Sequence, residues 1–321
     1  MIDLHLHLIL NKKAGSGNGL KISKKITTRL KQLNIIYHTY TTDYQGHAMA
    51  ITKKLLTDTL LPWKNESSDK TTPFPLLVVV GGDGTLHEVI NALANNFDIP
   101  LGYIPAGSGN DFARGVNLSQ EPLTALNHLL TCEKPQRFNL LHYHNHLTNQ
   151  ERWVNNNVGI GIDAAIVSQA NHSRLKKLLN MCHLGSMSYL LAASSVIFKQ
   201  KGFPLTVEFD GKKIDYPNAL LCTTTNHPYF GGGLALDPLA NPQEANMSLI
   251  VVDYQPPYRL IGLAVKLLRQ THFTSPNVHH YRMTELKLSS STAQFGQADG
   301  EELGQAPLKL TFSTNERFFW L

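Results

Sequence analysis

One short stretch of this chain restricts its fold more than any other part: an aliphatic run that leads directly into a glycine-rich turn. Residues 76–80 read Leu-Leu-Val-Val-Val, and Gly81-Gly82-Asp83-Gly84-Thr85 follows at once. A short, uninterrupted aliphatic run is typical of a strand that is buried on both faces of a sheet. A helical pattern over residues 86–94 comes next. The sequence therefore predicts a strand, a turn and a helix within a parallel α/β sheet.

The first 137 residues repeat this alternation of strand and helix. Strand-like runs and amphipathic helical patterns alternate over residues 4–10, 20–33, 35–41, 47–60 and 100–104. Such alternation is typical of a parallel sheet with crossover helices. We therefore expect an α/β domain over residues 1–137, and we expect residues 305–321 to return to it.

After residue 137 the pattern changes to strands that are separated by turn residues. Strand-like runs lie at residues 138–143, 152–158, 205–209, 219–225, 247–252 and 285–289. One helical block, residues 174–199, interrupts them. Residues 138–304 are therefore expected to form a second, mainly antiparallel β-sandwich domain.

Composition and cysteine spacing argue against a disordered chain, a disulfide framework and a membrane-spanning protein. The chain is 42% hydrophobic and 17% charged, which is ordinary for a globular protein. Its three cysteines, Cys132, Cys182 and Cys222, are far apart and form no CxxC pair, which fits a reducing cytoplasm. No window contains about 18 consecutive apolar residues, and the first residues lack the features of a signal peptide. We expect a cytoplasmic protein, and its net charge of +5 permits anionic partners.

Three glycine-rich turns carry the strongest functional signal, because each follows a predicted strand. They are Asn11-Lys12-Lys13-Ala14-Gly15-Ser16-Gly17, the turn at 81–85, and Gly107-Ser108-Gly109-Asn110-Asp111. Ligands of open α/β sheets bind at the carboxyl ends of the strands, so all three turns can face one crevice. Glycine lets the backbone approach a phosphate, which the N–H groups at a helix start can bind. Each turn alone could be an ordinary strand-to-helix connection, but three together favour phosphate binding. Neither the P-loop motif nor the dinucleotide fingerprint is present.

The turn at 81–85 resembles the nucleotide-binding signature of diacylglycerol, sphingosine and ceramide kinases and, more distantly, of NAD kinases and phosphofructokinases. Glu88 and Asn91 match the continuation of the lipid kinase signature. Residues 105–114, PAGSGNDFAR, resemble a second lipid kinase motif, and residues 157–164, NVGIGIDA, resemble a third. Residues 298–301, ADGE, match a late motif of the same kinases. The chain is thus identified as a member of the diacylglycerol kinase catalytic-domain family, with a Rossmann-like first domain as in NAD kinases and phosphofructokinases.

The resemblance implies a role for each matching position. The positions at which the family holds ATP are Asn11, Lys12, Lys13, Ala14, Gly15, Thr42, Gly81, Gly82, Asp83, Gly84, Thr85, Leu86, His87 and Ser108. Asp83 would help to hold the Mg²⁺ that accompanies ATP. Asp299 falls on the candidate general base, and Glu301 is the alternative proton acceptor. A carboxylate suits this role because a lipid hydroxyl is a poor nucleophile until its proton is removed.

The chain departs from the family at a second, structural Mg²⁺ position. Its matching residues are Gln243, Asn246 and Ser248, where Gln243 replaces an acidic residue and Ala245 replaces a glycine. A neutral amide offers no charge to offset the reluctant dehydration of Mg²⁺. We therefore expect this site to be weak or empty, with a water or a side-chain amide in the space.

The resemblance leaves the acceptor open. Diacylglycerol is the expected acceptor; a sphingoid base, monoacylglycerol and phosphatidylglycerol are alternatives. A kinase of a soluble polyol or nucleotide, or a catalytically silent nucleotide-binding regulator, fits the late motifs less well. We expect no nucleic acid partner and a peripheral contact with an anionic membrane surface, and we leave a homodimer open. The membrane contact is expected at Arg174, Lys176, Lys177, Lys199 and Lys201.

Overall fold

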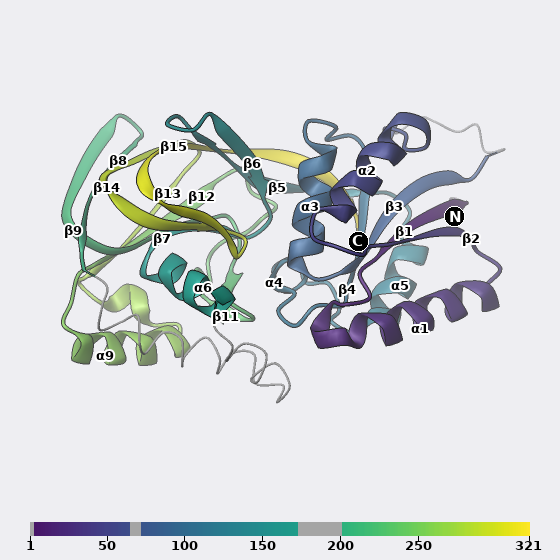
Figure 1. Ribbon diagram of the computed structural model, residues 1–321, viewed down its shortest axis with the longest axis horizontal. Coiled ribbons are helices and arrows are strands. Elements are labelled where there is room, and N and C mark those ends of the chain that lie inside the picture. Colours follow the sequence, from purple (N-terminus) through teal and green to yellow (C-terminus); the bar gives the residue numbers. More distant parts are fainter. Residues whose placement is uncertain (1–2, 65–71, 173–200) are drawn as a thin grey trace. The chain divides into compact units, whose positions relative to one another are not determined.

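The chain forms two compact units. The computed structural model describes residues 3–64, 72–172 and 201–321 (Figure 1). The first unit comprises residues 1–138 and 316–321, and the second comprises residues 139–315. Residues 305–315, which we expected in the first domain, belong to the second unit because β15 (Glu301–Trp320) pairs with β14 (Leu286–Ala298) as far as Phe312.

The first unit is built on a parallel sheet. Its strands are β1 (Leu4–Leu10), β2 (Ile36–Thr41), β3 (Phe74–Gly81) and β4 (Leu101–Pro105). They lie in the order β2-β1-β3-β4, all parallel, and the end of β15 continues the sheet where Phe319 and Trp320 pair with β4. The residues from Leu76 to Gly81 of β3 are all buried, as expected for a central strand with helices on both of its faces.

Helices cover both faces of this sheet. They are α1 (Asn18–Gln32), α2 (His47–Asp58), α3 (Asp83–Leu93), α4 (Asp111–Gly115) and α5 (Pro122–Thr131), with a short 3-10 turn η1 (Gly15–Gly17) before α1. The helices α2 and α3 pack together, as do α1 and α5, and Figure 1 shows the two pairs on opposite sides of the strands. In α1 the buried residues Ser23, Ile26 and Leu30 recur at helical spacing, which explains why this segment packs as a helix.

The second unit is mainly antiparallel. Its elements are β5 (Gln136–Asn145), which begins in the first unit, β6 (Gln150–Val154), β7 (Asn157–Gly161), α6 (Ile162–His172), β8 (Phe203–Phe209), β9 (Lys212–Thr225), β10 (Tyr229–Phe230), β11 (Leu234–Ala235), β12 (Met247–Asp253), α9 (Pro257–Leu268), η2 (His272–Thr274), β13 (Val278–Met283), β14 and β15. The main path is β13-β12-β9-β7-β14-β15, with β8 joining β14 and β9. Apolar side chains from strands across this sheet share one core, for example Met247 of β12, Phe203 of β8 and Phe312 of β15. The predicted helical block at 174–199 lies outside the described residues.

Candidate active site

The three glycine-rich turns meet at the carboxyl ends of the parallel strands of the first unit. Asn11, directly after β1, donates from Nδ2 to Oγ1 of Thr85, 2.9 Å away, and its backbone N–H donates to the carbonyl of Val80. The backbone N–H of Ala106, directly after β4, donates to the carbonyl of Gly81. The turns after β1, β3 and β4 are therefore joined to one another by hydrogen bonds.

Three glycines are required because the turns approach so closely. A Cβ on Gly82 would lie 3.1 Å from the Cα of Gly107, and a Cβ on Gly107 would lie 2.6 Å from the Cα of Gly82. Gly15 has a φ of +56°, and a Cβ there would lie 2.6 Å from the carbonyl oxygen of Ala106. Gly84 is different, because a Cβ at this exposed position would meet no atom within 4 Å. The space beside Gly84 is thus open to a ligand.

Asp83 links two helices of the first unit. Its Oδ2 accepts from the backbone N–H of Asp111 at 3.0 Å, and its Oδ1 accepts from that of Phe112 at 3.1 Å. The carboxylate therefore holds the start of α4, where negative charge is stabilised by the helix dipole. Each carboxylate oxygen has two lone-pair directions and can accept more than one contact. A carboxylate is a ligand type that Mg²⁺ takes together with phosphate oxygens and water, so Asp83 has the chemistry that the Mg²⁺ expected with ATP requires.

The other predicted ATP residues differ in exposure. Lys12, Lys13 and Ser108 are exposed, and Asn11 and Gly15 are half-buried. The buried positions are Ala14, Thr42, Gly81, Thr85, Leu86 and His87. Leu86 and His87 are buried in α3, and the backbone N–H groups of Thr85 and Leu86 donate to the carbonyl of Gly82 at 3.0 and 3.1 Å.

Glu88, a further residue of the signature, holds the start of a neighbouring helix. Its Oε1 accepts from the N–H of Gly46 at 2.8 Å, and its Oε2 accepts from the N–H of Ala48 at 3.1 Å. Gly46 precedes α2, so Glu88 caps that helix and joins it to α3.

Asp299 lies in the turn between β14 and β15 of the second unit, with a left-handed φ of +50°. Its Oδ2 accepts from the N–H of Asn155 at 2.8 Å. Its Oδ1 accepts from the N–H groups of Asn156 and Asn157, at 2.8 and 3.3 Å. The carboxylate is thus held by the bend between β6 and β7. Glu301, two residues further on, is half-buried at the start of β15.

Two residues that sequence reasoning did not select lie near this turn. Burial raises the pKa of the Tyr143 hydroxyl to about 12; Arg152 opposes this shift, and the charges of Asp299 and Glu301 add to it. The side-chain amide of Asn155 is buried, and neither its Oδ1 nor its Nδ2 has a hydrogen-bond partner among the described residues. The run Asn155-Asn156-Asn157 is the sequence signal that could have revealed the second residue.

A buried network connects the acidic turn to the start of α6. Gln297 donates from Nε2 to Oδ1 of Asn157 at 2.7 Å and accepts at Oε1 from the N–H of Gly300 at 2.9 Å. Burial raises the pKa of the Asp163 carboxyl to about 7, against hydrogen bonds from Ala164, Gln297 and Thr223. Gly159 makes room for this carboxyl, because a Cβ there would lie 1.7 Å from Oδ2 of Asp163.

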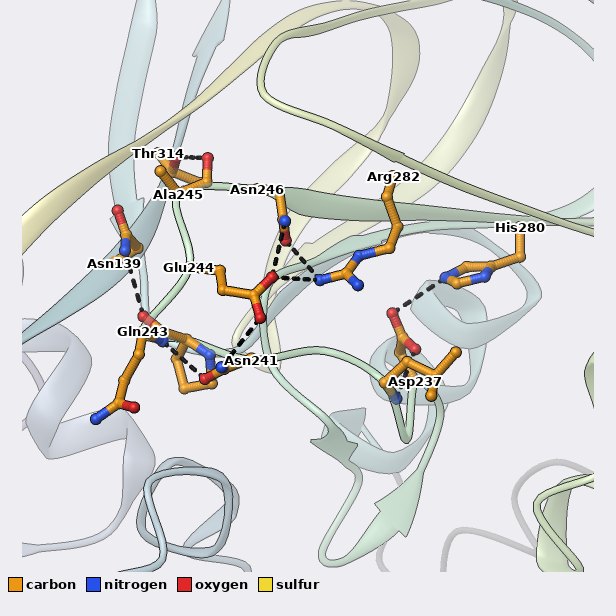
Figure 2. A network of polar contacts seen from close by, with 12 residues as sticks. Asn139, Asp237, Asn241, Gln243, Glu244, Ala245, Asn246, His280, Arg282 and Thr314 are labelled. Carbon is orange, nitrogen blue, oxygen red and sulfur yellow. Dashed lines mark hydrogen bonds and ion pairs between the residues drawn. The ribbon is translucent and has the colours of Figure 1, made fainter.

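The residues expected at the second Mg²⁺ position do not converge on a metal. Figure 2 shows the Gln243 side chain pointing away from its neighbours, and Ser248 is buried in β12, where its hydroxyl bonds to Asp237. Asn246 contacts Arg282 and Glu244: Nη2 of Arg282 lies 2.8 Å from Oδ1 of Asn246 and 2.9 Å from Oε2 of Glu244. The Glu244 carboxylate also accepts from the side-chain amides of Asn241 and Asn246, at 3.2 and 3.0 Å, so a guanidinium and two amides surround it. Among the described residues, no group of three or more His, Cys, Asp or Glu side chains could hold a metal ion.

The first unit thus carries glycine-rich turns at the strand ends of its parallel sheet, and the second unit carries an acidic turn between β14 and β15. Two family models match the chain. The diacylglycerol kinase catalytic domain matches residues 5–141, and the YegS C-terminal NAD kinase beta sandwich-like domain matches residues 156–315.

Named relatives agree with these matches. The chain is 28% identical over 321 residues to a Bacillus subtilis (strain 168) protein provisionally named lipid kinase YtlR, and the match covers 96% of this chain and 97% of the relative. It is 26% identical over 240 residues to a protein of Staphylococcus saprophyticus named diacylglycerol kinase, with 73% of this chain and 72% of the relative covered.

Solved structures show the same fold. A crystal structure of a provisionally named diacylglycerol kinase from Bacillus anthracis str. Sterne matches with a TM-score of 0.71 at 22% identity, covering 97% of this chain and 94% of the other. Another, from the same strain, matches with a TM-score of 0.64 at 18% identity, covering 97% and 93%. The chain belongs to the diacylglycerol kinase catalytic-domain family, and it is a phosphotransferase of the lipid kinase type. Over residues 3–64, 72–172 and 201–321, no helix is long and apolar enough to cross a bilayer.

Proposed function

We propose that the chain transfers the γ-phosphoryl group of ATP to the hydroxyl of diacylglycerol, which yields phosphatidic acid. The observation that carries this proposal is the meeting of the three glycine-rich turns at the strand ends, with the open space beside Gly84. The name of the Staphylococcus saprophyticus relative supports diacylglycerol as the acceptor.

In the first unit, ATP phosphates would lie against residues 81–85. The backbone at the start of α3, beside the exposed Gly84, would bind phosphate oxygens, and the helix dipole would add to their attraction. The exposed Lys12 and Ser108 side chains would complete the ATP site. Mg²⁺, held by Asp83 and the phosphates, would neutralise charge on the transferred group.

In the second unit, we assign the two carboxylates different roles. Three backbone N–H groups hold the Asp299 carboxylate in one orientation, so Asp299 is a positioning residue for the turn. Glu301 is the proton acceptor that removes the proton from the acceptor hydroxyl as the O–P bond forms. This assignment reverses the order of preference that the resemblance implied.

We further propose that the protein works in the cytoplasm and visits an anionic membrane surface from solution. The substrate hydroxyl lies at the level of the lipid headgroups, where a basic protein with a net charge of +5 is attracted to anionic lipids. The basic residues first expected to make this contact lie outside the described residues, apart from Lys201.

The test uses γ-labelled ATP, Mg²⁺ and purified lipids, each presented in the same detergent micelles. Labelled phosphatidic acid from diacylglycerol is the expected product. Preferential labelling of a sphingoid base, monoacylglycerol or phosphatidylglycerol would replace the acceptor in the proposal. A protein that binds ATP but labels none of these lipids or a total membrane lipid extract would contradict it.

A further inference from the structure

The helix α9 presents three different faces. Leu260 is buried, and Leu260 and Leu263 pack against Ile162 and Phe295. Leu267 joins a neighbouring apolar cluster. These residues recur at helical spacing and fix one face of α9 against its own unit.

A second face of α9 is apolar and exposed. Tyr258 and Ile261 are each 67% exposed, Val265 is 43% exposed and Leu268 is 61% exposed. Their spacing of three, four and three residues places them on one side of the helix. Single exposed apolar residues are ordinary, but a continuous stripe along three turns marks an interaction surface.

The third face is basic. Arg259 and Arg269 are exposed, Lys266 is half-buried, and all three adjoin the apolar stripe. From Tyr254 to Thr284 the sequence contains no Asp or Glu. The helix and the segments that flank it therefore contribute apolar side chains and positive charge, without acidic residues of their own, which is the chemistry of helices that lie in the interface of an anionic bilayer.

We infer that α9 docks on an anionic lipid surface, with Tyr258, Ile261, Val265 and Leu268 inserted among the lipids and Arg259 and Arg269 at the headgroups. This inference rests on the proposed function, because a kinase of a membrane lipid must meet its substrate there. A second copy of the chain fits less well, since a symmetric contact through this face would bring the basic side chains of both copies together.

The position of α9 within the second unit suits this role. Its inner face shares an apolar cluster with Phe295 of β14, and β14 leads at Ala298 into the turn that holds Asp299. The start of α6 belongs to the same cluster and to the buried network of Asp163. Docking through α9 would therefore bring the acidic turn, which is part of the same compact unit, close to the membrane.

The experiment compares sedimentation with vesicles of phosphatidylcholine alone and of phosphatidylcholine mixed with phosphatidylglycerol. The test variant is Ile261→Asp with Leu268→Asp. The matched control is Leu147→Asp with Leu239→Asp, because these residues are 57% and 62% exposed in the same unit but lie outside α9. A second variant, Arg259→Glu with Arg269→Glu, tests the charge. Thermal unfolding of all variants confirms that they fold.

The wild type and the control should bind the mixed vesicles, and the Ile261/Leu268 variant should bind them at least about tenfold more weakly. The Arg259/Arg269 variant should bind mixed vesicles more weakly than the wild type, with no change on vesicles of phosphatidylcholine alone. Added salt should have the same effect on the wild type. Equal vesicle binding by the Ile261/Leu268 variant and the wild type would overturn the inference, as would a wild type that binds no vesicles. A dimer that these aspartates convert to monomers, with vesicle binding unchanged, would assign the face to self-association instead.

Phosphorylation of short-chain diacylglycerol in detergent micelles separates this inference from the proposed function. The Ile261/Leu268 variant should keep wild-type turnover on micelles and lose turnover on mixed vesicles. If the wild type phosphorylates no lipid, the proposed function fails, and the vesicle comparison still decides the role of α9.

Discussion

At the scale of single residues, mutation can separate the roles proposed for Asp299, in the turn after β14, and for Glu301, at the start of β15. We expect Glu301→Gln to lower turnover by about 100-fold or more without changing the Tm, as for the loss of a general base. Asp299→Asn should lower both the turnover and the Tm, because its amide nitrogen would face a backbone N–H donor. This unmatched contact should cost about 1–3 kcal/mol of folding free energy.

Steady-state kinetics and thermal unfolding of both variants provide the measurement. If Asp299→Asn lost turnover at an unchanged Tm while Glu301→Gln stayed active, the proton acceptor would be Asp299.

Asp163 gives a prediction about pH. Its pKa is raised from 3.8 to about 7 by burial, so the folded protein binds a proton that the unfolded chain releases above pH 3.8. This contribution to stability is complete below pH 3.8 and is lost as the pH rises to about 7. Asp163→Asn mimics the neutral acid and should remove this loss, which is up to about 4 kcal/mol. Denaturant unfolding of both proteins from pH 4 to 8 measures it; parallel curves would show that Asp163 does not titrate as stated.

At the scale of elements, the turn between β3 and α3 separates packing from ligand binding. Gly82→Val should destabilise the fold and weaken ATP binding, because its side chain would meet Gly107. Gly84→Ala should keep or raise the Tm, since Ala favours a helix by about 1 kcal/mol over Gly. It should nevertheless weaken ATP binding, because a methyl group would occupy the open space beside the turn.

Calorimetric titration with ATP and Mg²⁺, together with thermal unfolding, tests both variants. Wild-type affinity in Gly84→Ala would place the phosphates elsewhere.

The loop before β12 is held by an element far from it in sequence, since Arg282 of β13 contacts Glu244 and Asn246. Without nucleotide, the wild-type Tm should be the same in Mg²⁺ and in EDTA. Arg282→Ala should lower the Tm and make it sensitive to Mg²⁺, because a carboxylate and an amide oxygen would lose their cation.

The control is Arg137→Ala, which removes the exposed pair of Arg137 with Glu316 and should change little. A wild-type Tm that falls in EDTA would show that a metal, not Arg282, holds the loop.

At the scale of the whole molecule, the end of the chain completes the unit that begins it. Trp320 is fully buried, and its Nε1 donates to the carbonyl of Leu129 at 3.0 Å. Its ring contacts Trp63 and Phe74. Trp320→Ala should lower the free energy of unfolding of the first unit by about 3–5 kcal/mol.

Urea unfolding, followed by circular dichroism with and without ATP, provides the measurement. Phe318→Ala is the control, because Phe318 is only half-buried on the same strand. An equal loss of unfolding free energy in Trp320→Ala and Phe318→Ala would contradict the larger contribution expected of Trp320 to the stability of the first unit.

The sequence by itself determined the parts of this protein that depend on neighbouring residues. The aliphatic run before Gly81 predicted a buried strand, and the order of the motifs predicted the family. The helix α9 escaped notice, because Pro256, Pro257 and Gly262 interrupt the usual helix signals and its apolar residues occupy two faces.

Only the tertiary structure decided the partners of the polar groups: the backbone of Asn155 to Asn157 for Asp299, and Arg282 for Glu244. Residue periodicity records which face of an element is buried, whereas these bonds join segments far apart in the sequence. Their geometry exists only after the sheet has brought those segments together.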